Sequence, residues 1–173
     1  MERTGILLFA FGTNLKIRSN QVLRKEVLRC CDANEVSTIF SQDAIMTDPY
    51  YGKHRVICFD QPNPNKHPPT LRIARWAIPL IASEFRYDSL IVIAADPHID
   101  RCMRDSNYVL HNSRITRYTN MKIKSWPTSE KYTDQDWFCA DSQQPRTRTR
   151  QAWEKRESVL MAMPMWFYTL VAG

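Results

Sequence analysis

Glycine is scarce in this chain, with four residues among 173. Dinucleotide-binding turns need three glycines at fixed spacing, and the G-x-x-x-x-G-K-[ST] phosphate loop needs two, and the sequence contains neither pattern. It also lacks an H-E-x-x-H pair, a G-x-S-x-G elbow and any cluster of Cys and His with metal-ligand spacing. These absences exclude the usual NAD and nucleoside-triphosphate fingerprints. We predict no metal site, and no cofactor is identified.

Long hydrophobic runs are absent as well. The longest, from Val159 to Ala172, is about 14 residues and contains Pro164, whereas a bilayer-spanning helix needs roughly 20 residues. The apolar stretch Gly5–Gly12 is too short for a signal peptide and lacks a basic region before it. The five cysteines are odd in number and form no C-x-x-C pair, which favours buried thiols over disulfides. We therefore expect a cytoplasmic protein without a membrane segment.

Positive charge is present in moderate excess, with a net charge of +6. This balance favours anionic ligands or surfaces without requiring nucleic acid. The densest basic stretch runs from Arg146 to Arg156. We interpret it as an exposed, solvated segment, and an RNA contact is the alternative. Most aromatic residues fall on stripes that suit a core, so nucleic acid is not an expected partner.

Short apolar runs alternate with helical patterns along the chain. Continuous apolar or β-branched runs predict strands at residues 5–11, 36–40, 55–59, 89–95 and 121–126. Helical stripes predict a helix around residues 23–31, another from Thr70 to Phe85 with a kink or restart at Pro79, and a third from Pro97 onward. Thr70 and Asp96 are the predicted N-caps of the last two helices.

This alternation determines the predicted fold. Strands that alternate with helices imply right-handed crossovers and a mostly parallel sheet. We predict a Rossmann-like α/β fold, a three-layer sandwich with a mostly parallel sheet of about five strands, as one domain over residues 1–173. Within it, residues 127–150 are predicted to be an irregular polar segment, and residues 151–170 a C-terminal helix that packs on the domain.

The carboxyl edge of this sheet is the predicted site, because ligands of open α/β sheets bind there at a topological switch point. Three segments should meet at that edge. The candidate ligand-binding residues are Gly12, Thr13, Asn14, Thr70, Arg72 and Arg101, and the candidate catalytic residues are His98 and Asp96.

Each candidate has a physical rationale and a simpler alternative. Gly12 permits close backbone approach, although a plain turn explains it equally. Helix starts attract anions, and Arg101 lies one turn after His98 on the same face. Histidine side chains usually titrate near neutral pH. The helix start should lower the pKa of His98, and the Asp96 carboxylate should raise it. The alternative is that Asp96 only caps the helix and Arg101 is its surface partner.

The same segments carry a family resemblance. Pro69-Thr70 at a helix start, and the strand end Ala94-Ala95-Asp96-Pro97-His98 followed by Arg101, resemble the YdcF-like family of domains of unknown function (DUF218). The segment 153–157 is similar to the closing helix of that family. After the second strand the chain has Ser41-Gln42-Asp43, where the family has serine-glycine-glycine. The resemblance implies a Rossmann-like fold with a polar pocket lined by Gly12, Thr70, His98 and Arg101, and in some members S-adenosylmethionine binding or an envelope role.

Three functions are consistent with these observations. The first is a domain that binds a small anionic or nucleotide-like ligand, with an S-adenosylmethionine-like molecule as one candidate and hydrolase or transferase activity as an option. The second is a non-catalytic interaction module that uses the basic segment 146–156 and the apolar end 161–170. The third is a chelatase-like tetrapyrrole enzyme, whose opening strand resembles residues 7–13, although the histidine expected at the strand end is absent.

Overall fold

The computed structural model describes residues 3–12, 16–42, 45–59, 68–114, 116, 119–128 and 130–172. Within these residues, six strands form one sheet in the order β3-β4-β2-β1-β5-β6. The strands are β1 (Thr4–Leu8), β2 (Val36–Gln42), β3 (Tyr50–Tyr51), β4 (His54–Phe59), β5 (Ser89–Ile93) and β6 (Lys122–Ser125). All neighbouring pairs are parallel except β3 with β4. The five parallel strands therefore follow the Rossmann order, with a switch point between β1 and β5.

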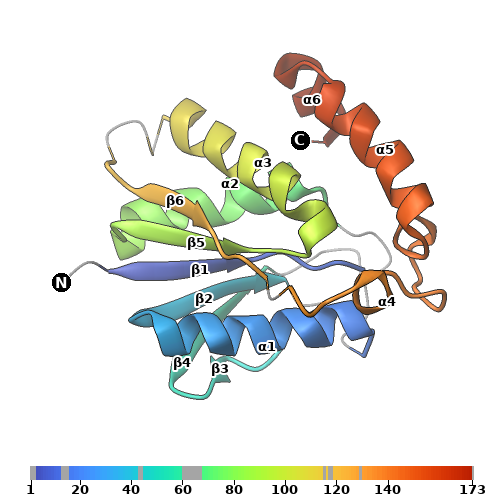
Figure 1. Cartoon of the computed structure of the whole chain (residues 1–173). Coiled ribbons are helices and arrows are strands. Elements are labelled where there is room, and N and C mark those ends of the chain that lie inside the picture. The colour runs from blue at the N-terminus through green and yellow to red at the C-terminus, as the bar shows by residue number, and fades with distance from the viewer. Residues whose placement is uncertain are drawn as a thin grey trace.

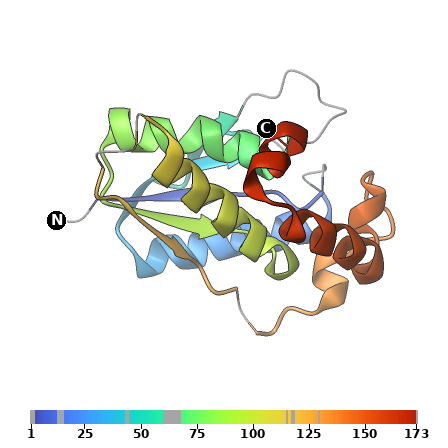
Figure 2. The ribbon, with the colours of Figure 1, turned by 90° about the horizontal axis from the view of Figure 1, so that it is seen from above.

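Helices cover both faces of this sheet (Figures 1 and 2). The helix α1 (Arg18–Ala33) lies on one face, and α2 (Thr70–Leu80) and α3 (Ile99–Asn112) lie on the other. The predicted Rossmann-like α/β fold is thus confirmed. Three more helices lie beyond the carboxyl edge of the sheet, α4 (Asp134–Trp137), α5 (Arg150–Ala162) and α6 (Met165–Ala172).

The strand β1 shows why an uninterrupted apolar run suits this position. Leu7 packs in the core under α2 and α3, whereas Ile6 and Leu8 pack in the core under α1. All three side chains are fully buried. A central parallel strand is covered on both faces, so it needs apolar residues at successive positions rather than at alternate ones.

The predicted strand 5–11 ends earlier in the structure, at Leu8. Phe9 still donates to the Ile93 carbonyl at 2.9 Å, but the next amides find side-chain acceptors. Ala10 donates to Gln42 Oε1 at 2.6 Å, and Phe11 donates to Asn20 Oδ1 at 3.0 Å. The side chains replace the missing ladder partners, so both amides are satisfied where the chain leaves the sheet.

Two predicted helix caps are wrong. The cap of α2 is Pro69, and Thr70 is the first helical residue, so its hydroxyl is available for other contacts. The strand β5 is followed by a 3-10 turn, Asp96–His98, which places the cap position at Ala95. The Asp96 carboxylate accepts from the Thr128 hydroxyl instead. Pro97 does stand in the first turn, as predicted.

Proline shapes two further helices. The helix α2 passes through Pro79 and is followed directly by a π-helical turn, Ile81–Phe85, so the helix does not restart at the proline. The predicted single helix 151–170 is two helices, because Pro164 lies between α5 and α6. No helix among the described residues is long and apolar enough to cross a membrane.

The segment 127–150 is less irregular than predicted. It contains α4, whose start is closed by reciprocal hydrogen bonds between Thr133 and Asp136. Trp137 at its end is 2% exposed and packs in the core under α1. A second 3-10 turn, Pro145–Thr147, leads into α5. This route brings the chain back over the carboxyl edge of the sheet.

Candidate functional site

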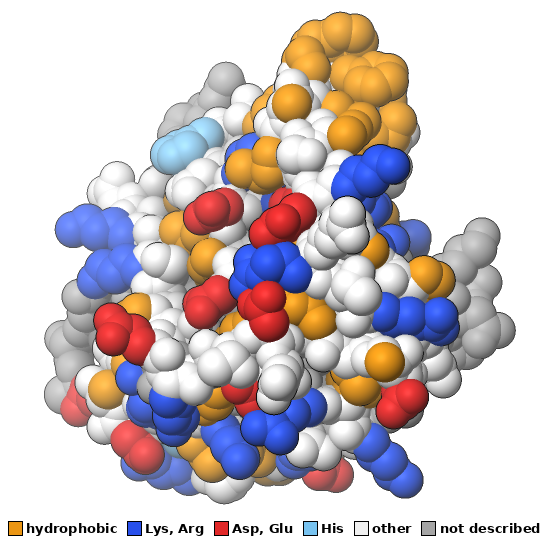
Figure 3. Space-filling model, turned by 45° about the vertical axis from the view of Figure 1, so that its right-hand side comes forward, with side chains coloured by type: hydrophobic (Ala, Val, Ile, Leu, Met, Phe, Trp, Pro, Cys, Tyr) orange, Lys and Arg blue, Asp and Glu red, His pale blue; other side chains and the backbone are white. Residues whose placement is uncertain are grey.

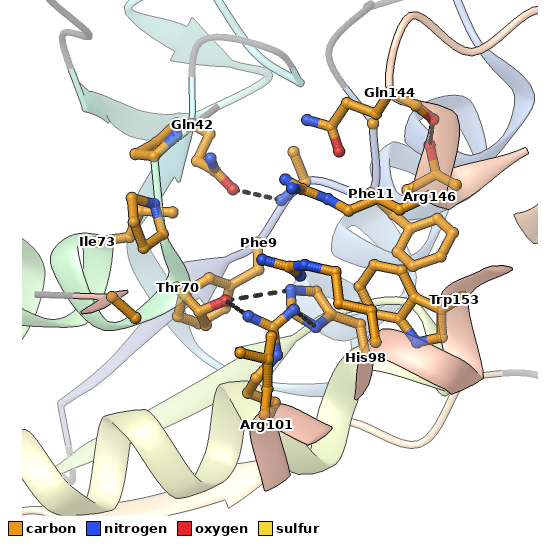
Figure 4. Close-up of a pocket in the computed structure, with 18 of the residues that line it drawn as sticks. Phe9, Phe11, Gln42, Thr70, Ile73, His98, Arg101, Gln144, Arg146 and Trp153 are labelled. Atoms are coloured by element: carbon orange, nitrogen blue, oxygen red, sulfur yellow. Dashed lines mark hydrogen bonds between the residues drawn. The ribbon is translucent and has the colours of Figure 1, made fainter. Parts of the chain in front are cut away.

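A cavity of about 480 Å³ opens at the carboxyl edge of the sheet (Figure 4). It lies beyond the ends of β1, β2 and β5, where the strand order reverses. Its size falls in the usual range for small-molecule sites, roughly 300–1,000 Å³. Its polar lining comprises Gln42, Thr70, His98, Arg101, Gln144, Arg146, Thr147 and Arg156. The structure therefore has a cavity at the edge where the sequence predicted a site.

His98, Arg101 and Thr70 form one hydrogen-bonded group on the wall of the cavity (Figure 4). Arg101 Nη1 donates to Thr70 Oγ1 at 3.0 Å, and Arg101 Nη2 lies 3.3 Å from His98 Nδ1. Because arginine only donates, His98 Nδ1 is the acceptor and the ring proton is on Nε2, 3.4 Å from Thr70 Oγ1. Thr70 thus accepts from both neighbours and keeps its own proton to donate.

Glu157 of α5 neutralises Arg101. Its two carboxylate oxygens accept from Arg101 Nε at 2.8 and 3.0 Å. Burial alone would lower the pKa of Arg101, but the carboxylate outweighs burial and raises it. Burial would likewise raise the pKa of Glu157, and the charge and hydrogen bonds of Arg101 help to lower it. This pair is charged and links α3 to α5 across the cavity.

His98 is neutral at physiological pH. Its side chain is 5% exposed, and burial is the main reason that its pKa falls from 6.5 to about 4. Arg101 lowers it further, and Glu157 opposes the shift. A lowered pKa of His98 was predicted from its place at a helix start, but the opposing group is Glu157 and not the predicted Asp96, which does not line the cavity. A neutral imidazole offers hydrogen bonds here rather than charge.

Two more arginines give the cavity its charge. Arg146 and Arg156 line it, are partly buried, and have no hydrogen-bond acceptor or ion-pair partner among the residues the structure describes. Burial lowers the pKa of Arg146 to about 10, and the neighbouring Arg156 and Arg101 add to that effect. Among the residues that the structure describes, three guanidinium groups face the single Glu157 carboxylate, which leaves two positive charges at the cavity.

Two amide groups lie unpartnered beside these charges. Gln42 is 1% exposed and Gln144 is 9% exposed, and each has a buried Nε2 with no hydrogen-bond partner in the described structure. The other end of Gln42 is fixed, because its Oε1 accepts from the Ala10 amide. Figure 4 shows both amides at the same cavity. A buried donor without an acceptor costs about 1–3 kcal/mol, which a ligand oxygen would recover.

Aromatic rings form the inner wall of the cavity. Trp153 of α5 lies with its ring centre 5.1 Å from His98 and 4.6 Å from Phe11. Its Nε1 donates to the Pro97 carbonyl at 2.7 Å, and Arg101 lies over its face at 5.6 Å. The rings hold the His98 imidazole in place and keep water away from it.

Gly12 lines the cavity, but close approach of a ligand is not what requires glycine at this position. Its φ is +101°, a conformation that favours glycine. A Cβ there would lie 2.3 Å from Ile17 Cδ1, so the space beside Gly12 belongs to a core side chain rather than to a ligand. Thr13 and Asn14, predicted beside it, lie outside the described residues.

The other candidates divide clearly. Thr70, His98 and Arg101 line the cavity together. Arg72 is exposed and does not line it, because residues two apart on a helix point to different sides. Asp96 is also outside the cavity lining and is hydrogen-bonded to Thr128.

Six polar residues of the site were not predicted from the sequence, namely Gln42, Gln144, Arg146, Thr147, Arg156 and Glu157. Five of them come from the segment 144–157, whose basic part was interpreted as solvated surface. Gln42 had a usable signal, because it follows the predicted strand 36–40 by two residues, at the carboxyl edge of the sheet. Among the described residues, no group of three or more His, Cys, Asp or Glu is placed to hold a metal ion.

No protein-family model matches the chain, and neither curated proteins nor solved structures provide a match.

Proposed function

We propose that this protein binds a small anionic, nucleotide-like ligand at the carboxyl edge of its sheet. The observation that carries the proposal is the pair of partly buried guanidinium groups, Arg146 and Arg156, without a carboxylate partner among the described residues. Buried charges are normally paired, because an unpaired one is costly to remove from water. An anion in the cavity supplies the missing partner.

The polar groups suit a phosphate. Arg146 and Arg156 provide forked donors that match phosphate oxygens, and Gln42 and Gln144 add neutral donors. Thr70 adds a hydroxyl proton that its neighbours do not use. Phe11 and Trp153 add aromatic surface beside these donors.

The charge also selects between ligands that the sequence left open. S-adenosylmethionine carries a sulfonium cation, which a cavity with two surplus positive charges repels. A phosphate-bearing ligand is attracted by the same field. A phosphate-bearing ligand is therefore a better candidate for this chain than S-adenosylmethionine, which the YdcF-like resemblance implies.

The supported activity is binding, with hydrolase or transferase chemistry as an extension. At pH 7, a His98 with a pKa of about 4 is a weak base. Asp96 does not line the cavity and is not placed to assist it. We therefore assign His98 to hydrogen bonding with the ligand rather than to proton abstraction.

The five cysteines are free thiols, three of them buried. Free thiols are typical of a reducing compartment, so we retain the cytoplasm as the proposed location. Nucleic acid stays an improbable partner in this proposal, because two of the basic residues that suggested it line the cavity. The alternative is an interaction module, and the observation that favours it is the exposed apolar side of α6.

The test is thermal unfolding with inorganic phosphate, nucleoside monophosphates and diphosphates, and S-adenosylmethionine. A ligand at 100 times its Kd stabilises the protein by about 2.7 kcal/mol. Arg146→Gln and Arg156→Gln should each weaken phosphate binding by at least about tenfold, since hydrogen bonds to charged groups contribute about 1.5–3 kcal/mol.

Lys155→Gln is the matched control, because Lys155 is an exposed cation next to Arg156 on α5. It removes the same charge without touching the cavity. If no compound stabilises the wild type, or if Lys155→Gln loses as much affinity as Arg156→Gln, the proposed function is wrong.

A further inference from the structure

One side of the cavity is apolar and open to solvent. Phe167 and Val171 of α6 line the cavity and are nevertheless 41% and 56% exposed. Leu160, Met163 and Ala172 line the same side. The cavity lining is therefore of two chemical kinds, arginines and amides on the one hand and the aliphatic and aromatic side chains of α5 and α6 on the other.

The apolar side continues out of the cavity along α6. Trp166 and Leu170 are 69% and 75% exposed. Helical geometry places them beside Phe167 and Val171, on the side of α6 that faces away from the core. On the opposite side, Tyr168 is fully buried and donates to Asp105 at 2.6 Å. Figure 3 shows hydrophobic side chains gathered at the end of the molecule where α6 lies.

The position of α6 is fixed by contacts from α3. Arg104 Nη1 donates to the Leu160 carbonyl at 2.9 Å, and its guanidinium lies 4.2 Å from the centre of the Tyr168 ring. Tyr168 in turn is bonded to Asp105. The exposed side of α6 is thus held beside the cavity by an ordered, buried anchor. Contiguous exposed apolar surfaces of this kind mark ligand or partner sites.

We propose that the ligand is an amphiphilic phosphate monoester, with its phosphate at Arg146 and Arg156 and its hydrocarbon chain lying along the exposed side of α6. The inference rests on the proposed function, since it uses the same anion site. The two surplus positive charges match the two negative charges of a phosphate monoester. Continuity of the apolar surface with the cavity sets the path of the chain.

The experiment measures binding of inorganic phosphate and of butyl, octyl and dodecyl phosphate, each below its micelle concentration, by calorimetry. Each methylene group removed from water should tighten binding about fourfold. Octyl phosphate has four more methylene groups than butyl phosphate. If all four are buried, it should bind about 200-fold more tightly than butyl phosphate. Octanol, which has the chain without the phosphate, should bind far more weakly than octyl phosphate.

The variant Trp166→Ser/Leu170→Ser removes the outer part of the surface without changing a residue that lines the cavity. It should bind inorganic phosphate as the wild type does and lose the gain from the longer chains. Tyr50→Ser is the matched control, since Tyr50 is 64% exposed on β3 at the edge of the sheet. It should keep the full chain-length dependence.

The outcomes separate this inference from the proposed function. Phosphate binding without chain-length dependence overturns the amphiphile and leaves the anion site in place. No binding of any phosphate overturns both. A dimer in light scattering that Trp166→Ser/Leu170→Ser dissociates would assign the surface to a second copy of the chain. Attachment to anionic vesicles with no gain for monomeric alkyl phosphates would assign it to a bilayer, and either result overturns the inference.

Discussion

Among the described residues, His98 is the histidine that lines the cavity, and its protonation state can be changed by lowering the pH, without any mutation. In the unfolded chain it takes up a proton near its ordinary pKa of 6.5, whereas in the folded protein burial and Arg101 delay protonation to about pH 4. The unfolded state therefore binds more protons between these values. Stability is fully present above pH 6.5 and is lost as the pH falls through this window.

The magnitude follows from the two pKa values. Between pH 7 and pH 4.5, the difference in protonation of His98 should reduce the free energy of unfolding by about 2 kcal/mol. The lower limit of pH 4.5 is chosen because of Glu157. Its pKa is lowered in the folded protein, so its own contribution is lost only below its ordinary value of 4.5.

The assay is urea unfolding at several pH values between 7 and 4.5, for the wild type and for His98→Gln. The variant keeps a hydrogen-bonding side chain but cannot titrate, so it should lose about 2 kcal/mol less than the wild type over this range. His111→Gln, which changes an exposed histidine of α3, should follow the wild type. Equal losses in wild type and His98→Gln would refute the buried, neutral imidazole.

Two further substitutions test the packing around the cavity. Gly12→Ala should destabilise the protein by at least about 1 kcal/mol more than Gly52→Ala, because a Cβ at Gly12 meets Ile17 while nothing lies within 4 Å at Gly52. Equal costs in urea unfolding would contradict this. Trp153→Ala should cost about 3–5 kcal/mol, and Trp166→Ala, at an exposed position, about 0.5 kcal/mol or less. A small cost at Trp153, measured in the same way, would show that α5 does not close the cavity.

The fold was predictable because its main determinants are local. The apolar runs of β1 and β5 indicate strands covered on both faces, and helical stripes between strands imply parallel crossovers. The end of β1 was not predictable in this way. Ala10 and Phe11 leave the ladder and donate their amides to the side chains of Gln42 and Asn20, which lie 32 and 9 residues further along the chain.

The site was predictable in part. The rule that ligands bind at strand ends located Thr70, His98 and Arg101. Spacing also explains why the prediction for Arg72 was wrong. Arg72 follows Thr70 by two residues and lies on another side of its helix, whereas Arg101 follows His98 by three residues and lies on the same side. The anion-binding groups were missed because α5 returns over the sheet edge only through tertiary contacts. Composition cannot distinguish a basic segment that faces solvent from one that faces a cavity.

The pairing of Arg101 with Glu157 has a consequence for how the protein acquires its site during synthesis. The two residues are 56 positions apart, and the partners Asp105 and Tyr168 are 63 apart. All six strands of the sheet precede residue 126, so the sheet can be completed on the ribosome before α5 and α6 emerge. The cavity then forms as the last step, when those helices dock. A nascent chain halted before α5 would have the sheet but no binding site.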